Sequence, residues 1–140
     1  IVMSLMIGEY MEFALKRDAE LVELSGGRIW PVIAPEEMEG AYPYVIYAMD
    51  GMEEASTKDG IYGDTVREEI LVCGRSVAEV ENVADAVRRA MERALPAWND
   101  ESDERPFLVQ DQTFRAGAED FDLNHDGFFL PLNYVIETER

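Results

Sequence analysis

The sequence is poor in cysteine, histidine and basic residues, and each shortage excludes a class of function. It contains one cysteine, Cys73, and one histidine, His125. An internal disulfide is therefore impossible, which suits synthesis in a cytosol, and a zinc site lacks the several Cys or His ligands it needs. Lysine and arginine number 12 against 30 acidic residues, a formal charge of −18. Because DNA binding depends on Lys and Arg replacing counterions, we expect no specific nucleic-acid binding.

The sequence also lacks membrane-directing segments and catalytic motifs. No run of 18 apolar residues is present, so no membrane-spanning helix is expected. The apolar segment Ile1–Ile7 has no basic leader or small-residue cleavage site, so no signal peptide is predicted. There is no phosphate-binding P-loop, dinucleotide fingerprint or nucleophile elbow. We therefore predict that the protein is not an enzyme and has no cofactor and no metal.

The 140 residues, of which 47% are hydrophobic, suffice for a single domain spanning residues 1–140 with a real core. Apolar residues recur at helical spacing through Ser4–Leu24, which predicts an amphipathic helix ended by Gly26–Gly27. Ser76 and Glu79 form a capping box that starts a second helix, in which acids lead and arginines trail. Pro96 is expected to end that helix.

The remaining segments are rich in β-favouring residues. We predict a long loop over Asp50–Asp64, because three glycines and several charges interrupt the apolar pattern there, with an antiparallel pairing of the strands on either side. The expected strands are Arg28–Ala34, Tyr42–Met49, Thr65–Cys73, Phe107–Ala116 and Phe128–Glu137.

The predicted element order is therefore α-β-β-β-α-β-β. This order indicates an α+β fold with a mainly antiparallel, or mixed, sheet of about five strands. The two amphipathic helices are expected to cover one face of that sheet.

Residues 120–127 resemble the start of a calcium-binding loop, because acids or amides alternate there. The match fails at the sixth position, where His125 replaces the required Gly, and at the twelfth, where Pro131 replaces a bidentate Glu. A hairpin connection closed by Asp126–Gly127 is the preferred interpretation, with His125 as a solvated loop residue.

Two other features could carry chemistry. Cys73 lies near a helix start and Arg75, which could lower its pKa, but a buried strand cysteine is the better interpretation. Aromatic side chains could stack on nucleobases, but the strong negative charge favours core and interface packing instead. These aromatic residues are Trp30, Tyr42, Tyr44, Tyr47 and Trp98.

Several segments together resemble the tail terminator (tail-completion, or minor tail) proteins of long-tailed phages. They are the first helix, the segment RIWPVIAP at residues 28–35, the Tyr-Pro-Tyr-Val segment at residues 42–45, a charged strand, and Ser-x-x-Glu opening an Ala-, Val- and Arg-rich helix. The resemblance covers roughly Leu5–Leu95 and extends, with weaker agreement, through Ile136. The sequence departs from the family pattern in the acidic linker Asn99–Arg105 and in the Asp-rich final turn.

The resemblance implies a structural protein of a phage or prophage virion tail, made in the cytoplasm of the bacterial host. Such proteins form a homo-hexameric ring that caps the tail tube and joins it to the head connector. The tail tube protein and the head–tail connector proteins would then be its partners, with no membrane involved. The predicted loop would contact neighbouring subunits or the tube through Met52, Glu53, Glu54, Lys58, Asp59, Ile61 and Tyr62.

Two alternatives stay open at the level of sequence. An acidic type III secretion chaperone has a similar element order and binds an unfolded effector segment as a dimer, although the chain lacks a clear helix after its last strand. An enzyme that holds a metal on acidic loops is the third class.

Overall fold

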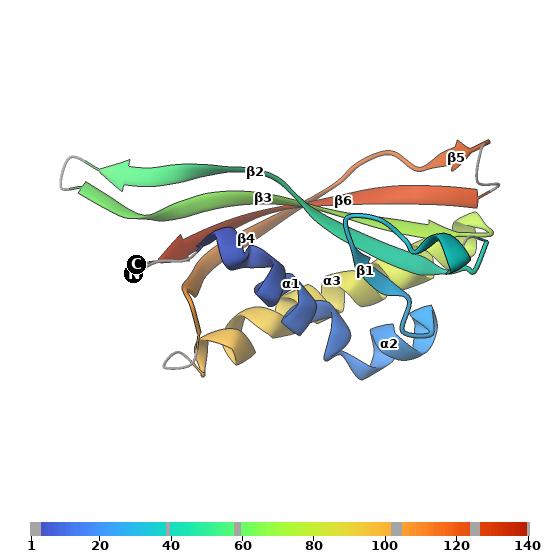
Figure 1. Cartoon of the computed structure of the whole chain (residues 1–140), viewed down its shortest axis with the longest axis horizontal. Coiled ribbons are helices and arrows are strands. Elements are labelled where there is room, and N and C mark those ends of the chain that lie inside the picture. The colour runs from blue at the N-terminus through green and yellow to red at the C-terminus, as the bar shows by residue number, and fades with distance from the viewer. Residues whose placement is uncertain (1–3, 39, 58–59, 102–104, 124–126, 140) are drawn as a thin grey trace.

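The computed structural model describes residues 4–38, 40–57, 60–101, 105–123 and 127–139. Within them three α-helices lie on one face of a mixed six-stranded sheet of order β1-β2-β3-β6-β4, with β5 also paired to β6 (Figure 1). The predicted α+β class is confirmed. The elements are η1 (Ser4–Met6), α1 (Ile7–Lys16), α2 (Ala19–Ser25), β1 (Ile29–Pro31), η2 (Glu36–Met38), β2 (Tyr44–Thr57), β3 (Gly60–Gly74), α3 (Val77–Asn99), β4 (Leu108–Ala116), β5 (Asp120–Asp122) and β6 (Gly127–Glu139).

The first predicted helix is in fact two helices. Asp18 adopts an extended backbone conformation, and its side chain accepts a hydrogen bond from the Leu21 amide at 3.0 Å. This is an N-cap, so the chain leaves α1 after Lys16 and starts α2 in a new direction. The predicted stop is confirmed, because Gly26 ends α2 in the left-handed region at φ 63°.

The predicted loop over Asp50–Asp64 is wrong. Strands β2 and β3 continue through it as one long antiparallel hairpin, with pairs running from Tyr44 opposite Cys73 to Thr57 opposite Gly60. The antiparallel pairing itself was predicted correctly. A β-bulge interrupts the register between Met49 and Gly51. Glycine is common at bulges as well as in loops, so Gly51 made the segment resemble a loop.

Strand β1 is much shorter than the predicted Arg28–Ala34. It covers three residues and pairs in parallel with β2, which makes the sheet mixed. It ends because Val32 has a positive φ of 65°, a conformation that cannot continue a strand.

Helix α3 begins as predicted but ends later. The Ser76 hydroxyl accepts from the Glu79 amide at 3.1 Å, and the Glu79 carboxylate accepts from the Arg75 amide at 2.9 Å. The capping box is thus confirmed, with the carboxylate reaching one residue beyond its usual partner. Pro96 does not end the helix, which continues to Asn99.

The C-terminal strands follow the predicted pattern closely. Strand β4 starts one residue later than expected, and β6 extends slightly beyond Phe128–Glu137 at both ends. Strand β5 was not predicted, and it pairs antiparallel with the start of β6, Asp122 lying opposite Gly127. The segment therefore joins two strands, as the hairpin interpretation expected; residues 124–126 themselves lie outside the described part.

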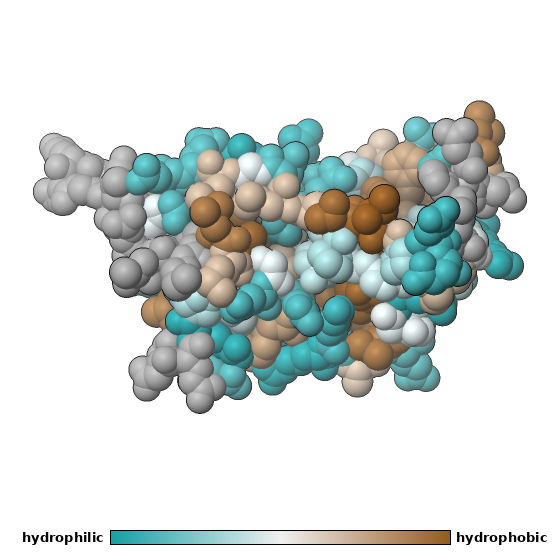
Figure 2. All heavy atoms as spheres, in the orientation of Figure 1, coloured by the Kyte–Doolittle hydropathy of each residue, from teal (hydrophilic) through white to brown (hydrophobic). Residues whose placement is uncertain are grey.

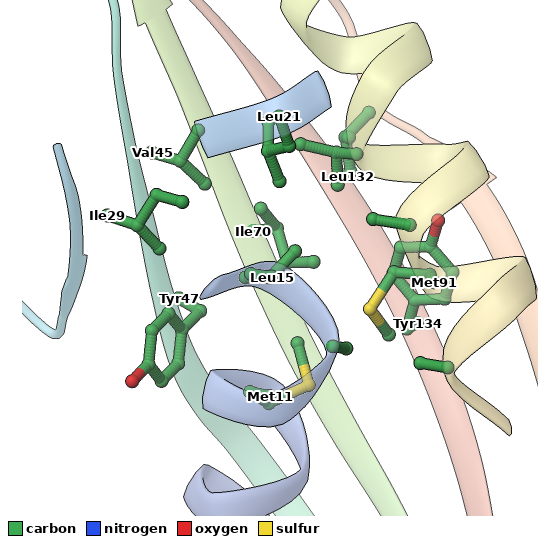
Figure 3. Packing of buried hydrophobic residues seen from close by; sticks show 14 of the residues in the cluster. Met11, Leu15, Leu21, Ile29, Val45, Tyr47, Ile70, Met91, Leu132 and Tyr134 are labelled. Atoms are coloured by element: carbon green, nitrogen blue, oxygen red, sulfur yellow. The ribbon is translucent and has the colours of Figure 1, made fainter. Parts of the chain in front are cut away.

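The core lies between the sheet and the helices. Every second residue of β3 and β6 points toward α1 and α3, and side chains from all of these elements meet there (Figure 3). Tyr10 and Trp98 pack edge to face at 5.3 Å between ring centroids, an arrangement that aromatic pairs prefer. The largest fully buried apolar side chains are Trp98, Tyr10, Met11, Leu15, Leu21, Ile29, Ile70, Met91, Leu132, Ile136 and Val45.

We predict that Gly63→Ala destabilises the protein. A Cβ at Gly63 would lie 1.9 Å from the Thr138 carbonyl oxygen, so β3 and β6 would have to separate. Overpacking of this kind costs about 1–3 kcal/mol. Urea denaturation would measure the loss. Gly8→Ala is the control, because nothing lies within 4 Å of a Cβ there and Ala is favoured over Gly in a helix by up to about 1 kcal/mol. Equal stability of the Gly63 variant and the parent would contradict the close approach.

Candidate interaction surface

The β2–β3 hairpin extends beyond its neighbours in the sheet (Figure 1). Strand β1 leaves β2 at Tyr47, and the last β3–β6 pair is Gly63 with Glu139. Within the described residues, β2 from Ala48 onward therefore has one unpaired edge. At the tip, among these residues, Ser56 and Thr57 pair only with Ile61 and Gly60. An unpaired edge presents backbone donors and acceptors to a partner.

The predicted contact residues fall on this hairpin. Met52 points to the helix side and packs against the core, Glu53 lies on the other face, and Glu54 is exposed opposite Asp64. Ile61 and Tyr62 belong to β3. Lys58 and Asp59 lie outside the described residues.

Two features of the hairpin were missed from the sequence. The Arg67 guanidinium contacts the Glu53 carboxylate at 2.5 Å and lies over Gly51, where a Cβ would come within 2.2 Å of it. Gly51 has a φ of 148°, which favours glycine. The only sequence clue was the Asp-Gly pair at residues 50–51, which predicts a turn as readily as a bulge. The Arg67–Glu53 ion pair therefore links β3 to the bulged strand β2 on the sheet face away from the helices.

Glu68 is the unusual residue at the base of the hairpin. Its side chain is 2% exposed on the helix-facing side of β3, between Met49 and Tyr134 of the adjacent strands. Its Oε2 has no hydrogen-bond partner among the described residues. Burial raises the pKa of the Glu68 carboxyl to about 7, because a low-dielectric environment disfavours the charged form.

We predict that Glu68→Gln stabilises the protein above pH 7 and changes little below pH 4. The pKa of Glu68 is higher in the folded than in the unfolded protein. The stability that the neutral carboxyl contributes is therefore fully present below pH 4.5 and is lost as the pH rises to about 7. The loss is on the order of 3 kcal/mol. Denaturation curves of both proteins between pH 4 and 8 would test this. If the unfolding free energies of the two proteins change in parallel with pH, the Glu68 carboxyl ionises in the folded protein without destabilising it.

The other candidate sites gain no support. Among the described residues no group of three or more His, Cys, Asp or Glu side chains is placed to hold a metal ion. His125 lies outside the described residues. Cys73 is 5% exposed, as the buried-strand interpretation predicted, and burial raises the pKa of its thiol to about 11. Such a thiol is a poor nucleophile at neutral pH. No described helix is long and apolar enough to cross a membrane.

The aromatic residues divide between the two faces of the sheet. Tyr47 and Trp98 are buried in the core under the helices. Tyr42 stacks on Tyr44 at 5.4 Å, and Trp30 lies 5.8 Å from Tyr44, all near the start of β2. Packing, as expected from the sequence, accounts for both groups.

Comparisons with known proteins give a family and similar solved structures. The family model described as tail completion protein gp17 matches residues 11–122. A chain from the structure titled "Virion of native gene transfer agent (GTA) particle" is similar with a TM-score of 0.64 and 20% identity, over 93% of this chain and 92% of that chain. At that identity the likeness shows the fold alone. No curated protein sequence matches the chain.

Proposed function

The chain belongs to the tail completion protein gp17 family and is therefore a structural protein of a phage-type tail, and we propose that it forms the ring that ends the tail tube. In this role copies of the chain associate as a homo-hexamer, cap the tube protein and offer a surface to the head connector. The protein is made in the host cytoplasm and resides in the virion tail, and its function is structural, not catalytic.

The observation that carries the proposal is the overhanging hairpin. A ring requires heterologous contacts, in which one surface of a subunit meets a different surface of the next. The sheet offers two different free edges within the described residues, β2 beyond Tyr47 on one side and β4 on the other. The hairpin would contact the neighbouring subunit or the tube through Met52, Glu53, Glu54, Lys58, Asp59, Ile61 and Tyr62.

The charge of the chain supports a passage for DNA. A formal charge of −18 leaves a surface that repels phosphates. A ring with acidic walls would let DNA pass without holding it. No observation favours the secretion chaperone.

Light scattering over a wide concentration range, with negative-stain images of the same samples, tests ring formation directly. The same measurement with purified tail tubes covers the case in which the tube is needed to start the ring. Six-membered rings, alone or at tube ends, are expected. A tight dimer under both conditions, with tubes left uncapped, would overturn the proposal.

We predict that Glu54→Lys impairs ring formation or tube capping without unfolding the protein. Glu54 is exposed on the hairpin, so reversing its charge changes the proposed contact surface while leaving the core intact. Glu23→Lys is the matched control, because Glu23 is exposed on α2, on the helical side of the molecule. We expect at least a roughly tenfold loss of capped tubes for the first variant only. If both variants cap tubes equally well, the hairpin is not part of the interface.

A further inference from the structure

A groove lies on the sheet face that the helices leave uncovered, at the end of β2 and β3 away from the hairpin tip. Its volume is about 570 Å³, within the range of sites that hold small molecules or a few side chains. The floor is apolar and consists of Ile46, Leu71 and Phe129, one from each of three adjacent strands. The segment from Ile33 to Met38 forms one wall. The groove is thus a preformed apolar site built on three paired strands of the sheet.

Exposed apolar side chains surround this groove. Val32 is 73% and Ile33 74% exposed, and Leu123, which follows the groove residue Asp122, is 85% exposed. Figure 2 shows apolar atoms at the surface over the segment between β1 and η2. Clustered exposed apolar residues around a concave site are typical of an interaction surface.

The backbone holds this rim in a strained form. Val32 is β-branched yet has a φ of 65°, a conformation that such residues avoid. Its amide donates to the Tyr47 carbonyl at 2.9 Å, and the Ile33 amide donates to the Pro31 carbonyl at 2.7 Å. These bonds keep both side chains at the surface. Strain of this kind tends to accumulate where a protein binds a partner.

The polar part of the groove is acidic. Glu36 and Asp122 line it, and Asp122 lies close enough to raise the pKa values of both Tyr44 and Cys73 in addition to the larger effect of their burial. Two arginines lie beside the groove, and both are bonded to backbone carbonyls: Arg75 lies over the Tyr42 ring at 5.9 Å and donates to the Gly40 carbonyl at 3.2 Å, and Arg28 donates to the Tyr42 carbonyl at 3.0 Å. An occupant therefore meets apolar carbon at the floor and carboxylates at the edge.

We propose that this groove binds an extended segment of a neighbouring virion protein, in which apolar side chains alternate with lysine or arginine. The charges select this occupant over a second copy, since the hairpin that a neighbouring copy would insert carries Glu53, Glu54 and Asp64. Only the source of the segment rests on the proposed function. The chemistry of the groove is tested without it.

The probe is a blocked synthetic peptide of about seven residues that alternates lysine and leucine, compared with one that alternates glutamate and leucine. Nitrogen-15 NMR titration of the full chain is expected to show shifts at the groove residues with the lysine peptide only. Glu36→Gln combined with Asp122→Asn should weaken its binding by about tenfold, whereas Glu23→Gln on α2 should not. Ile33→Ser should also weaken it, in contrast to Leu5→Ser, which removes a side chain that is 70% exposed elsewhere.

Three outcomes would overturn the inference. The first is that no groove shifts appear at millimolar lysine peptide. The second is that the two peptides bind equally, since the carboxylates would then play no part. The third is that the same residues shift with protein concentration alone, since a second copy would then occupy the groove. The first two results do not bear on ring formation, whereas the third would mean that copies contact one another through the groove. A failure to form rings would not alter the peptide titration.

Discussion

The pairing of β3 along its whole length is the constraint on which the rest of the molecule depends. Of its 15 residues, Gly60–Gly74, all but Tyr62 and Gly74 pair with β2 on one side, and those from Gly63 onward pair with β6 on the other. Because side chains alternate along a strand, this pairing commits one face to the helices and leaves the other uncovered. The ionisable Glu68 falls on the buried face, so the register that buries Val66 and Ile70 also buries a carboxyl. A shift of one residue would release it but expose the core.

The helical layer is fixed to the sheet by directional bonds as well as by burial. The Tyr10 hydroxyl donates to Gln112 Oε1 at 2.7 Å, and Gln112 Nε2 donates to the Met91 carbonyl at 2.7 Å, which links α1, β4 and α3. At the end of α3, the Trp98 indole donates to the Phe107 carbonyl, and the Asn99 side chain pairs with both the amide and the carbonyl of Val109. These contacts explain why the last turn of α3 stays helical beyond Pro96.

Local patterns predicted the elements whose determinants are local. The cap at Ser76 is defined within four residues, and the alternation of β6 within ten, so both were found. The Asp18 cap was not predicted, because its hydrogen bond depends on where the chain turns between α1 and α2. Helix α3 continues past Pro96 because Trp98 and Asn99 form hydrogen bonds to the segment before and at the start of β4. Such long-range bonds are not visible in a local sequence pattern. The continuation of β2 and β3 through residues 50–64 was missed because the glycines and charges there interrupt the apolar alternation, and, among the side chains that the structure describes, only Met52 packs against the core from this part of β2. The pairing of β2 with β3 was therefore predicted, but the length of the two strands was not.

The distribution of charge connects the fold to the partners. The cations in the described ion pairs face acids of their own chain: Arg67 faces Glu53, Arg89 faces Glu20, and Arg93 faces Asp18. Exposed pairs of this kind contribute little stability. Within the described residues they engage five of the 12 basic residues, and with 30 acids in the chain most carboxylates have no basic partner to offset them. Repulsion between such surfaces disfavours contacts between copies wherever backbone pairing does not outweigh it. The same surfaces attract basic segments. Contacts between subunits are therefore expected at strand edges, where backbone bonds act regardless of charge, and contacts with other proteins where carboxylates border apolar surface.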